Sequence, residues 1–461
     1  MKLANDIRDM IHDTYFLKKT VLLAVPVAMQ GLLNTVVNLV DNLMIGSLGA
    51  TAIASVGLAN KVFFVFSLLV FGVVSGSGIL AAQYWGNHDV KNIRKVLGIS
   101  LMIALIGAIL FLIPARWNPR MVMRIFTTSE SSIEMGAAYL MVAALSYPCT
   151  AVTNTYVAML RSVNRVKEPV IISCVAILTN ITFNYIFIFG HFGAPALGVV
   201  GAALATLIAR ILEMTLILLT VYVGKTPLAC HVRELFGYSK EFLIQFARTS
   251  APVICNEFMW GLGTTIYSMA YGRMGDEAVA AITIATTIQD LAVVLFQGLS
   301  AATAVILGNE LGAGKLKRAE NYARYLLILQ FFLTIVAAVF VVGIRWKVIG
   351  LYQPGISDAV AEATSACLIV FALFMPFKMF NYVNIVGVLR SGGDTVMCLF
   401  IDTSGVWFIG IPLAFLGALV LKFPIHIVYA MVLLEEVYKA IIGFIRYRQK
   451  KWLRNLAQEI A

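Results

Sequence analysis

The chain has 461 residues, of which 60% are hydrophobic and only 13% are charged. A soluble domain cannot bury that much apolar surface, whereas a chain that crosses a bilayer many times exposes it to lipid. The composition therefore excludes a soluble globular protein and indicates an integral membrane protein.

The net charge of +11 would by itself suit a nucleic-acid-binding protein. Most of the Lys and Arg residues, however, fall in loops and tails on one side of the spans that the sequence predicts. This asymmetry follows the positive-inside rule, so we expect no nucleic-acid partner and place both termini in the cytoplasm. The N-terminal residues are too polar for the apolar region of a signal peptide, and we expect a multi-pass protein of the plasma (inner) membrane.

Twelve apolar segments follow one another along the chain, each near the ~20 residues that a membrane-spanning helix needs. The connections between them are short, so no separate soluble domain fits. The predicted fold class is therefore an all-α integral membrane protein. In chain order the predicted transmembrane helices cover residues 17–45, 51–82, 96–114, 134–160, 169–190, 196–224, 241–271, 277–307, 321–344, 359–389, 395–421 and 424–446.

The first helices of the chain are repeated with a constant offset of 226 (252 − 26). Further on, Leu160-Arg161-Ser162 matches Leu389-Arg390-Ser391 at an offset of 229 (390 − 161). Chance does not keep one offset over so many residues, so the chain holds two copies of one six-helix unit. The matched pairs at the first offset are Pro26 and Pro252, Gly46 and Gly272, Gly49 and Gly275, Ala54 and Ala280, Gly72 and Gly298, Gly86 and Gly312, and Lys91 and Lys317.

Each copy holds six spans, an even number, so both copies share one orientation in the membrane. They are parallel repeats related by a pseudo-two-fold axis along the membrane normal, with a cavity expected between them. We predict an N-terminal lobe over residues 1–224 (helices 1–6), a cytoplasmic linker over 225–240, and a C-terminal lobe over 241–461 (helices 7–12) with a basic C-terminal tail. Pro26 and Pro252 are expected to bend the first helix of each lobe.

Several stretches resemble the multidrug and toxic compound extrusion (MATE) transporters. One runs from Pro26 through Gly46-Ser-Leu-Gly49, and its copy runs from Pro252 through Gly272-Arg-Met-Gly275. The segment from Asn180 to Gly190 is similar to the fifth helix of that family. The resemblance covers nearly the whole chain. It implies an antiporter that exports organic, cationic or amphipathic, compounds in exchange for Na⁺ or H⁺ by alternating access.

Asp41 is an acidic residue within the first predicted span. A carboxylate costs at least ~2.5 kcal/mol at the centre of a spanning helix, so we treat it as a functional candidate. At 100° per residue it shares one face, within about 80°, with three polar residues, and this stripe is expected to face protein or water and not lipid. The supporting residues of the stripe are Gln30, Asn34 and Asn38.

Asn180, Asn184 and Thr206 lie at depths in their predicted spans that permit contact with Asp41. A carboxylate with amide and hydroxyl oxygens suits a hard monovalent cation or a proton site. The resemblance implies cation coupling by an acidic residue of the first helix with partners on helices five and six. Some relatives carry Asp where this chain has Asn184, which leaves Na⁺ and H⁺ both open. A structural carboxylate near the outer interface is the alternative.

Glu257 is the second candidate, and Trp260 and Tyr271 share its predicted helix face. An acid beside aromatic rings can receive an organic cation by charge and cation–π attraction. The resemblance implies a role in substrate, proton or sodium binding for a glutamate of the seventh helix. Asp402, in the eleventh span, can join Glu257 in the C-terminal lobe. A structural role is the alternative for both acids.

Five more ionisable residues fall within predicted spans, and they are assigned no firm function. Asp290 can line the cavity, and the two lysines can act as counter-ions or extend to an interface. The five are Lys61, Arg210, Glu213, Asp290 and Lys378.

The scattered Cys and His residues show no ligand spacing, so no transition-metal site is expected. No nucleophile–base arrangement indicates an enzyme, and no cofactor beyond the coupling ion is expected.

The runner-up function is a lipid-linked oligosaccharide flippase of the same broad architecture, followed by a channel or receptor. The expected partners are small-molecule organic substrates and the lipid bilayer, and the protein is expected to be monomeric.

Overall fold

A computed structural model describes residues 2–352 and 355–458, and helices make up nearly all of this part of the chain. Three segments near the C-terminus, labelled η, are π-helical. In chain order the elements are α1 (Lys2–His12), α2 (Thr14–Gly46), α3 (Ala50–Gly86), α4 (Val90–Trp117), α5 (Pro119–Arg124), α6 (Glu130–Ala143), α7 (Ser146–Ser162), α8 (Lys167–Phe189), α9 (Val199–Tyr222), α10 (Val232–Phe236), α11 (Lys240–Gly272), α12 (Asp276–Gly312), α13 (Leu316–Gly350), α14 (Asp358–Asn381), η2 (Tyr382–Leu389), α15 (Thr395–Ser404), η3 (Gly405–Gly410), α16 (Ile411–Phe415), η4 (Leu416–Val420) and α17 (Ile425–Arg448).

Nine helical stretches of the described chain are long and apolar enough to cross a membrane, and the bent pair of α6 and α7 makes a tenth. The two other predicted spans are α11 and α17, which are helices of 33 and 24 residues. Both are long enough to span. They carry charged residues within the predicted span, which lowers their hydropathy, and several of these residues are buried.

The internal repeat is visible in the helix boundaries. The helices α2 and α11 each have 33 residues, and their first residues, Thr14 and Lys240, are separated by the first offset of the repeat. The helices α3 and α12 each have 37 residues and keep the same offset (276 − 50). The helices α9 and α17 keep it as well (425 − 199). The glycines that precede α3 and α12, Gly49 and Gly275, have the φ angles 109° and 100°, which glycine adopts without steric cost.

The chain divides into two compact units whose limits differ from the predicted lobes. We call Met29–Ile254 the N-terminal unit, and the chain up to Ala28 together with the chain from Cys255 onwards the C-terminal unit. The divisions thus fall within α2 and α11, two residues after each proline, and not in the predicted linker 225–240. That segment instead folds onto the N-terminal unit, where Arg94 of α4 contacts both the backbone oxygen of Pro227 at 3.2 Å and Glu234 of α10 at 2.7 Å.

Close helix crossings explain why α2 and α11 each divide their residues between the units. A Cβ atom on Gly298 of α12 would lie 2.5 Å from the backbone oxygen of Ala24, in the first half of α2. At the equivalent position of the other copy, a Cβ on Gly72 of α3 would lie 2.7 Å from the Cα of Ile254, in the first half of α11. Glycine at both places permits backbone contact that any side chain would block.

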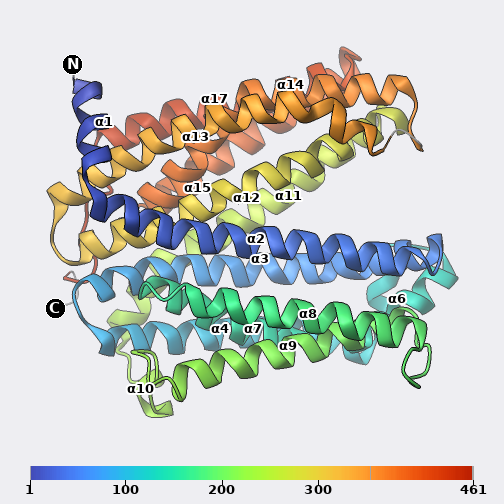
Figure 1. Cartoon of the computed structure of the whole chain (residues 1–461), viewed down its shortest axis with the longest axis horizontal. Coiled ribbons are helices and arrows are strands. Elements are labelled where there is room, and N and C mark those ends of the chain that lie inside the picture. The colour runs from blue at the N-terminus through green and yellow to red at the C-terminus, as the bar shows by residue number, and fades with distance from the viewer. Residues whose placement is uncertain (1, 353–354, 459–461) are drawn as a thin grey trace. The chain divides into compact units, whose positions relative to one another are not determined.

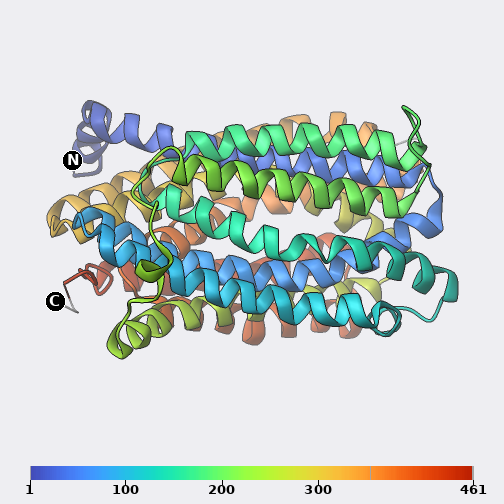
Figure 2. The ribbon, with the colours of Figure 1, turned by 90° about the horizontal axis from the view of Figure 1, so that it is seen from below.

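The long helices of each unit run nearly parallel to one another, as both ribbon views show (Figures 1 and 2). In the N-terminal unit α8 lies beside α9, and in the C-terminal unit α14 lies beside α17. Each unit has its own apolar core. Both ends of the described chain contact the start of α13, through ion pairs of Asp6 with Arg324 at 2.8 Å and of Lys450 with Glu320 at 2.6 Å.

Candidate substrate and ion sites

The N-terminal unit contains a cavity of about 570 Å³. Residues of α2, α3, α6, α7, α8 and α9 line it, and its wall is rich in amide and hydroxyl groups. The sequence-predicted residues that the structure places in this wall are Asn34, Asn38, Asp41, Asn180, Asn184 and Thr206. The predicted N-terminal site residues are therefore brought together, with the exception of Gln30.

Asp41 is the acidic group at the centre of this arrangement. Its Oδ1 accepts a hydrogen bond from the amide of Asn184 at 2.6 Å. Among the described residues no basic side chain forms an ion pair with Asp41, and the arginine that lines the same cavity, Arg210, is paired with Glu213 at 2.7 Å. A carboxylate that a neutral amide alone supports needs a proton or a cation for full compensation at low dielectric.

The predicted partners of Asp41 form a continuous set of hydrogen bonds. Asn184 also donates to Oδ1 of Asn180 at 3.2 Å, and Asn180 donates to the hydroxyl of Thr206 at 3.3 Å. The Oδ1 atom of Asn184 is buried and accepts no hydrogen bond within the described part of the chain. It is an acceptor without a donor beside a carboxylate, which is the combination that a hard cation would satisfy.

Gln30 lies outside the cavity wall, although it belongs to the predicted polar stripe. Its amide donates to the hydroxyl of Ser173 at 2.9 Å, and its oxygen accepts from Arg161 at 3.2 Å. Ser173 in turn donates to Glu213 at 3.0 Å. The sequence marked Arg210 and Glu213 as ionisable residues of one span, but their pairing was not predicted. Their spacing of three residues on one helix could have indicated it.

In the C-terminal unit the structure places Glu257 beside a basic residue that was not among the predicted site residues. The Oε1 of Glu257 accepts from Arg390 at 3.0 Å, and the same guanidinium lies 3.9 Å from Oδ2 of Asp402. Asn256 donates to Asp402 at 2.9 Å. The available signal in the sequence is the repeated Leu-Arg-Ser around Arg390, which was used only as evidence of the duplication.

The predicted aromatic partners do not gather around Glu257. The side chain of Trp260 is 46% exposed. Tyr271 is buried in the apolar core of the unit, and it lies 14 residues beyond Glu257, which is about 21 Å along a helix. The helical wheel considers only the angle around the helix axis and takes no account of the distance along the helix.

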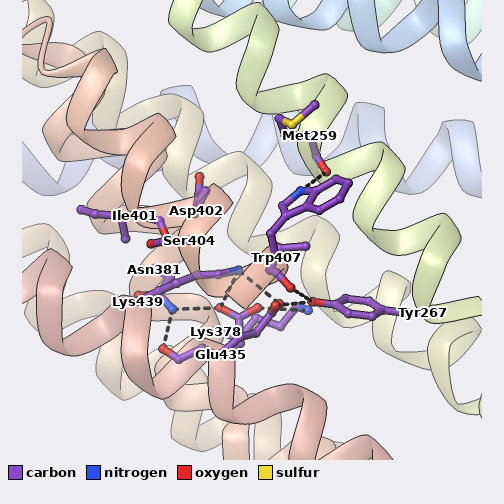
Figure 3. A network of polar contacts seen from close by, with 12 residues as sticks. Met259, Tyr267, Lys378, Asn381, Ile401, Asp402, Ser404, Trp407, Glu435 and Lys439 are labelled. Carbon is purple, nitrogen blue, oxygen red and sulfur yellow. Dashed lines mark hydrogen bonds and ion pairs between the residues drawn. The ribbon is translucent and has the colours of Figure 1, made fainter. Parts of the chain in front are cut away.

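A second polar network, which the sequence did not predict, lies around α17 (Figure 3). Glu435 accepts from Lys439 at 3.2 Å and from the hydroxyl of Tyr267. Glu436 accepts from Asn381 at 2.8 Å and pairs with Lys378 at 3.5 Å, so this lysine is a counter-ion and does not extend to an interface. Two adjacent acids with a lysine three and four residues later, within a predicted span, were the available signal.

Comparison with protein families agrees with this architecture. The family model MatE matches residues 26–186 and 252–416, which is one match in each copy of the repeat and more than half of the chain. Among related sequences, the chain is 25% identical over 425 residues to "Uncharacterized transporter YisQ" of Bacillus subtilis, covering 90% of each chain. It is 25% identical over 399 residues to "Multidrug resistance protein MdtK" of Yersinia pseudotuberculosis, covering 86% of each chain.

Solved structures show the same fold. The outward-facing conformation of a multidrug resistance MATE family transporter of the MOP superfamily superposes with a TM-score of 0.86 at 21% identity, covering 94% of this chain and 95% of that one. A MOP superfamily transporter from Pyrococcus furiosus, described as having a binding pocket of reversed polarity, gives the same TM-score, identity and coverage. The predicted twelve-helix, two-lobe architecture is that of these proteins, and the chain belongs to the MATE family of multidrug efflux transporters.

Proposed function

We propose that this protein exports small organic compounds, cationic or amphipathic, in exchange for Na⁺ or H⁺, with Asp41 as the residue that binds the coupling ion. The observation that carries the proposal is the position of Asp41 in the cavity wall, where it is hydrogen-bonded to Asn184 and forms no ion pair with any described basic residue. The carboxylate is thus available to an ion or to a cationic substrate.

The cavity suits exchange because both ligands would use the same carboxylate. A Na⁺ ion would take oxygens from Asp41, Asn180, Asn184 and Thr206, whereas a proton would need Asp41 alone. Either ligand removes the negative charge that attracts a cationic substrate, so binding of one weakens binding of the other. The transporter would then expose its binding region to one side of the membrane and afterwards to the other.

We also propose that Glu257 contributes to substrate or proton binding in the C-terminal unit, together with Asp402, and without the aromatic residues Trp260 and Tyr271 that do not gather around it. Support comes from the two carboxylates that share one guanidinium, since Arg390 can compensate only one of them. Glu257→Gln is expected to weaken a cationic substrate by about tenfold and a neutral one by much less, because a desolvated charge pair is worth ~1.5 kcal/mol or more. Equal losses for the two substrates, measured by equilibrium binding, would argue against charge recognition.

The same proposal places the protein in the plasma (inner) membrane as a monomer, with both termini in the cytoplasm. Pro26 and Pro252 are proposed as the points at which α2 and α11 bend. Both prolines lie inside continuous helices and just before the boundary between the two units.

A flippase for lipid-linked oligosaccharides is not favoured. Such a substrate carries a diphosphate and would need unpaired basic side chains in the cavity. Among the described residues the cavity wall holds one arginine, Arg210, which already forms an ion pair with Glu213.

The test is efflux of a lipophilic organic cation, tetraphenylphosphonium, from proteoliposomes with a Na⁺ gradient, an H⁺ gradient or neither. We expect one of the two gradients to drive export, and Asp41→Asn to abolish that stimulation in a folded protein. Glu134→Gln is the matched control, because Glu134 is an exposed carboxylate of the same unit. Undiminished stimulation in Asp41→Asn would contradict the proposed coupling role.

A further inference from the structure

A polar junction is present twice in the molecule, once in each unit. In the N-terminal unit it consists of Arg161, Gln30 and Ser173, and we call it the N-terminal junction. In the C-terminal unit it consists of Arg390, Asn256 and Asp402, and we call it the C-terminal junction. The two arginines correspond in the repeat (390 − 161 = 229), and so do Ser173 and Asp402 (402 − 173 = 229).

One contact of the junctions is repeated at corresponding positions, although the residues there differ. Gln30 and Asn256 also correspond, at the first offset of the repeat, and each donates its side-chain amide at 2.9 Å to the equivalent residue, Ser173 or Asp402. Arg161 lies in the last turn of α7, and Arg390 directly follows η2; each is the arginine of its junction. They reach α2 at Gln30 and α11 at Glu257, four and five residues after the respective proline. A geometry kept through duplication, while the side chains changed, indicates a function common to both units.

Polar contacts hold the second half of α2 more than burial does. No residue from Met29 to Met44 is buried, although this segment belongs to the N-terminal unit. The side-chain hydrogen bonds that join it to other helices of the unit are those of Gln30 and the bond of Asp41 with Asn184. The two attachment points are 11 residues apart on one face, about 16 Å along the helix.

A series of hydrogen bonds connects the N-terminal junction to the cavity wall. Each of them is donated in the same direction along the series. Arg161 donates to Gln30, Gln30 to Ser173, and Ser173 to Glu213. This series of hydrogen bonds ends at the carboxylate of Glu213. The same carboxylate also accepts a hydrogen bond from Arg210, a residue of the cavity wall. Hydrogen bonds aligned in this way strengthen one another at low dielectric.

We propose that Arg161 and Arg390 are positioning residues, which fix α2 and α11 one turn beyond their prolines. In the N-terminal unit Arg161 thereby sets the position of Asp41 relative to Asn184. Arg161 does not touch the ion or the substrate. It acts through Gln30 and through α2, the helix that carries both Gln30 and Asp41.

The two junctions differ in charge. The N-terminal junction holds a guanidinium and neutral partners, with Glu213 and Arg210 paired beyond it. At the C-terminal junction the guanidinium faces two carboxylates, those of Glu257 and Asp402.

The first test measures the attachment itself and does not depend on the proposed coupling. Spin labels at Leu43 of α2 and Leu178 of α8, which are 67% and 66% exposed, report the distance between the two helices by pulsed electron paramagnetic resonance in a cysteine-free background. Arg161→Met should broaden the distance distribution, and Arg161→Lys should broaden it less. Arg165→Met, which removes an exposed arginine of the same region, is the control. A distribution unchanged by Arg161→Met would overturn the junction.

The second test rests on the proposed function, and it asks whether the attachment positions Asp41. The half-saturating concentration of the coupling ion for efflux should rise by about tenfold in Arg161→Met, which is a usual size for the energetic coupling between two sites of a protein. The rise should be smaller in Arg161→Lys. Broadened distances with an unchanged ion dependence would overturn the positioning of Asp41 while leaving the ion site itself intact.

Ser173→Ala keeps the test decisive if Arg161→Met fails to fold. The change removes one hydrogen-bonding residue of the series and leaves Arg161 and Glu213, the charged residues at its two ends, in place. It should therefore broaden the same distance distribution and raise the half-saturating concentration of the coupling ion by a smaller factor. An unchanged distance distribution in a folded Ser173→Ala protein would count against the junction.

Discussion

The last helices of the two repeats, α9 and α17, carry the same ion pair with its polarity reversed. Arg210 and Glu213 of α9 correspond in the repeat to Glu436 and Lys439 of α17 (436 − 210 and 439 − 213). In the N-terminal unit both residues of the pair line the cavity. In the C-terminal unit additional charges surround it and close the network (Figure 3).

Replacements around the pair explain this difference. Asp41 corresponds to Tyr267 (267 − 41), whose hydroxyl donates to Glu435. Glu435 itself stands where the N-terminal unit has Ala209 (435 − 209). The C-terminal unit thus has a longer side chain at each of these two positions, and the two side chains contact each other. Gly410 contributes as well, since a Cβ there would lie 2.0 Å from the Tyr267 hydroxyl.

Asp41 and Glu436 differ in what compensates their charge. Asp41 has no ion-pair partner among the described residues, so its charge costs stability, and ligand binding is its proposed role. Glu436 is held by Lys378, Lys439 and Asn381, so its charge supports the folded unit. Substitutions that remove each charge without changing shape should therefore have opposite consequences.

The largest effect on stability is expected from Glu436→Gln. The change leaves buried Lys439 with one carboxylate fewer and Lys378 without its partner, and breaking a buried ion pair costs about 3–5 kcal/mol. Thermal unfolding in detergent should show the loss. The exposed pair of Arg120 and Glu134 is the control, because Glu134→Gln should cost no more than ~1 kcal/mol. Equal stabilities of Glu436→Gln and Glu134→Gln would show that the closed network contributes nothing to folding.

The helix crossings are where the two units are alike, and Gly72→Ala and Gly298→Ala should therefore have similar costs. Each added methyl would meet backbone atoms at 2.7 Å or 2.5 Å, and overpacking of this kind costs about 1–3 kcal/mol. Gly343→Ala is the matched control, because a Cβ there meets nothing within 4 Å and alanine favours the helix by roughly 0.5–1 kcal/mol. Unfolding in detergent measures all three. A cost at only one crossing would break the equivalence of the two.

A smaller effect is expected from Arg210→Met, which acts on the open side of the comparison. Removing the guanidinium makes the cavity more negative by one charge, so an organic cation should bind about fivefold more tightly, or roughly 1 kcal/mol. Isothermal titration with tetraphenylphosphonium measures the change. Arg120→Met removes an arginine of the same unit that is 62% exposed, and it should leave the affinity unaltered. Weaker binding by Arg210→Met would mean that Arg210 serves the substrate and not only Glu213.

Sequence alone predicted the fold well because the signals for it are long and redundant. Apolar segments marked the spans, and the first offset of the repeat reappears in the limits of α2 and α11, of α3 and α12, and of α9 and α17. The boundary between the compact units could not be predicted in this way. It depends on where Gly72 and Gly298 let the first halves of α11 and α2 cross, which is a matter of tertiary packing.

The candidate sites were predictable to the extent that periodicity determines them. The wheel of α2 placed Asp41 with Asn34 and Asn38 in one cavity wall, as the structure has it. It could not show that Gln30 turns to Ser173, because neighbouring helices decide which polar residue finds a partner. The pairing of Glu257 with Arg390 was hidden for the same reason, since 133 residues separate the two.

The most direct test of the coupling role is ion binding to purified protein, with and without the Asp41 carboxylate. Equilibrium binding of radioactive Na⁺ and proton release on addition of tetraphenylphosphonium should be measured for the wild type, Asp41→Asn and Glu134→Gln. We predict that the wild type and Glu134→Gln bind one coupling ion that the substrate displaces, and that Asp41→Asn loses this ion while its unfolding temperature falls little or rises. Displacement of the same ion by substrate in Asp41→Asn would contradict the coupling role of Asp41.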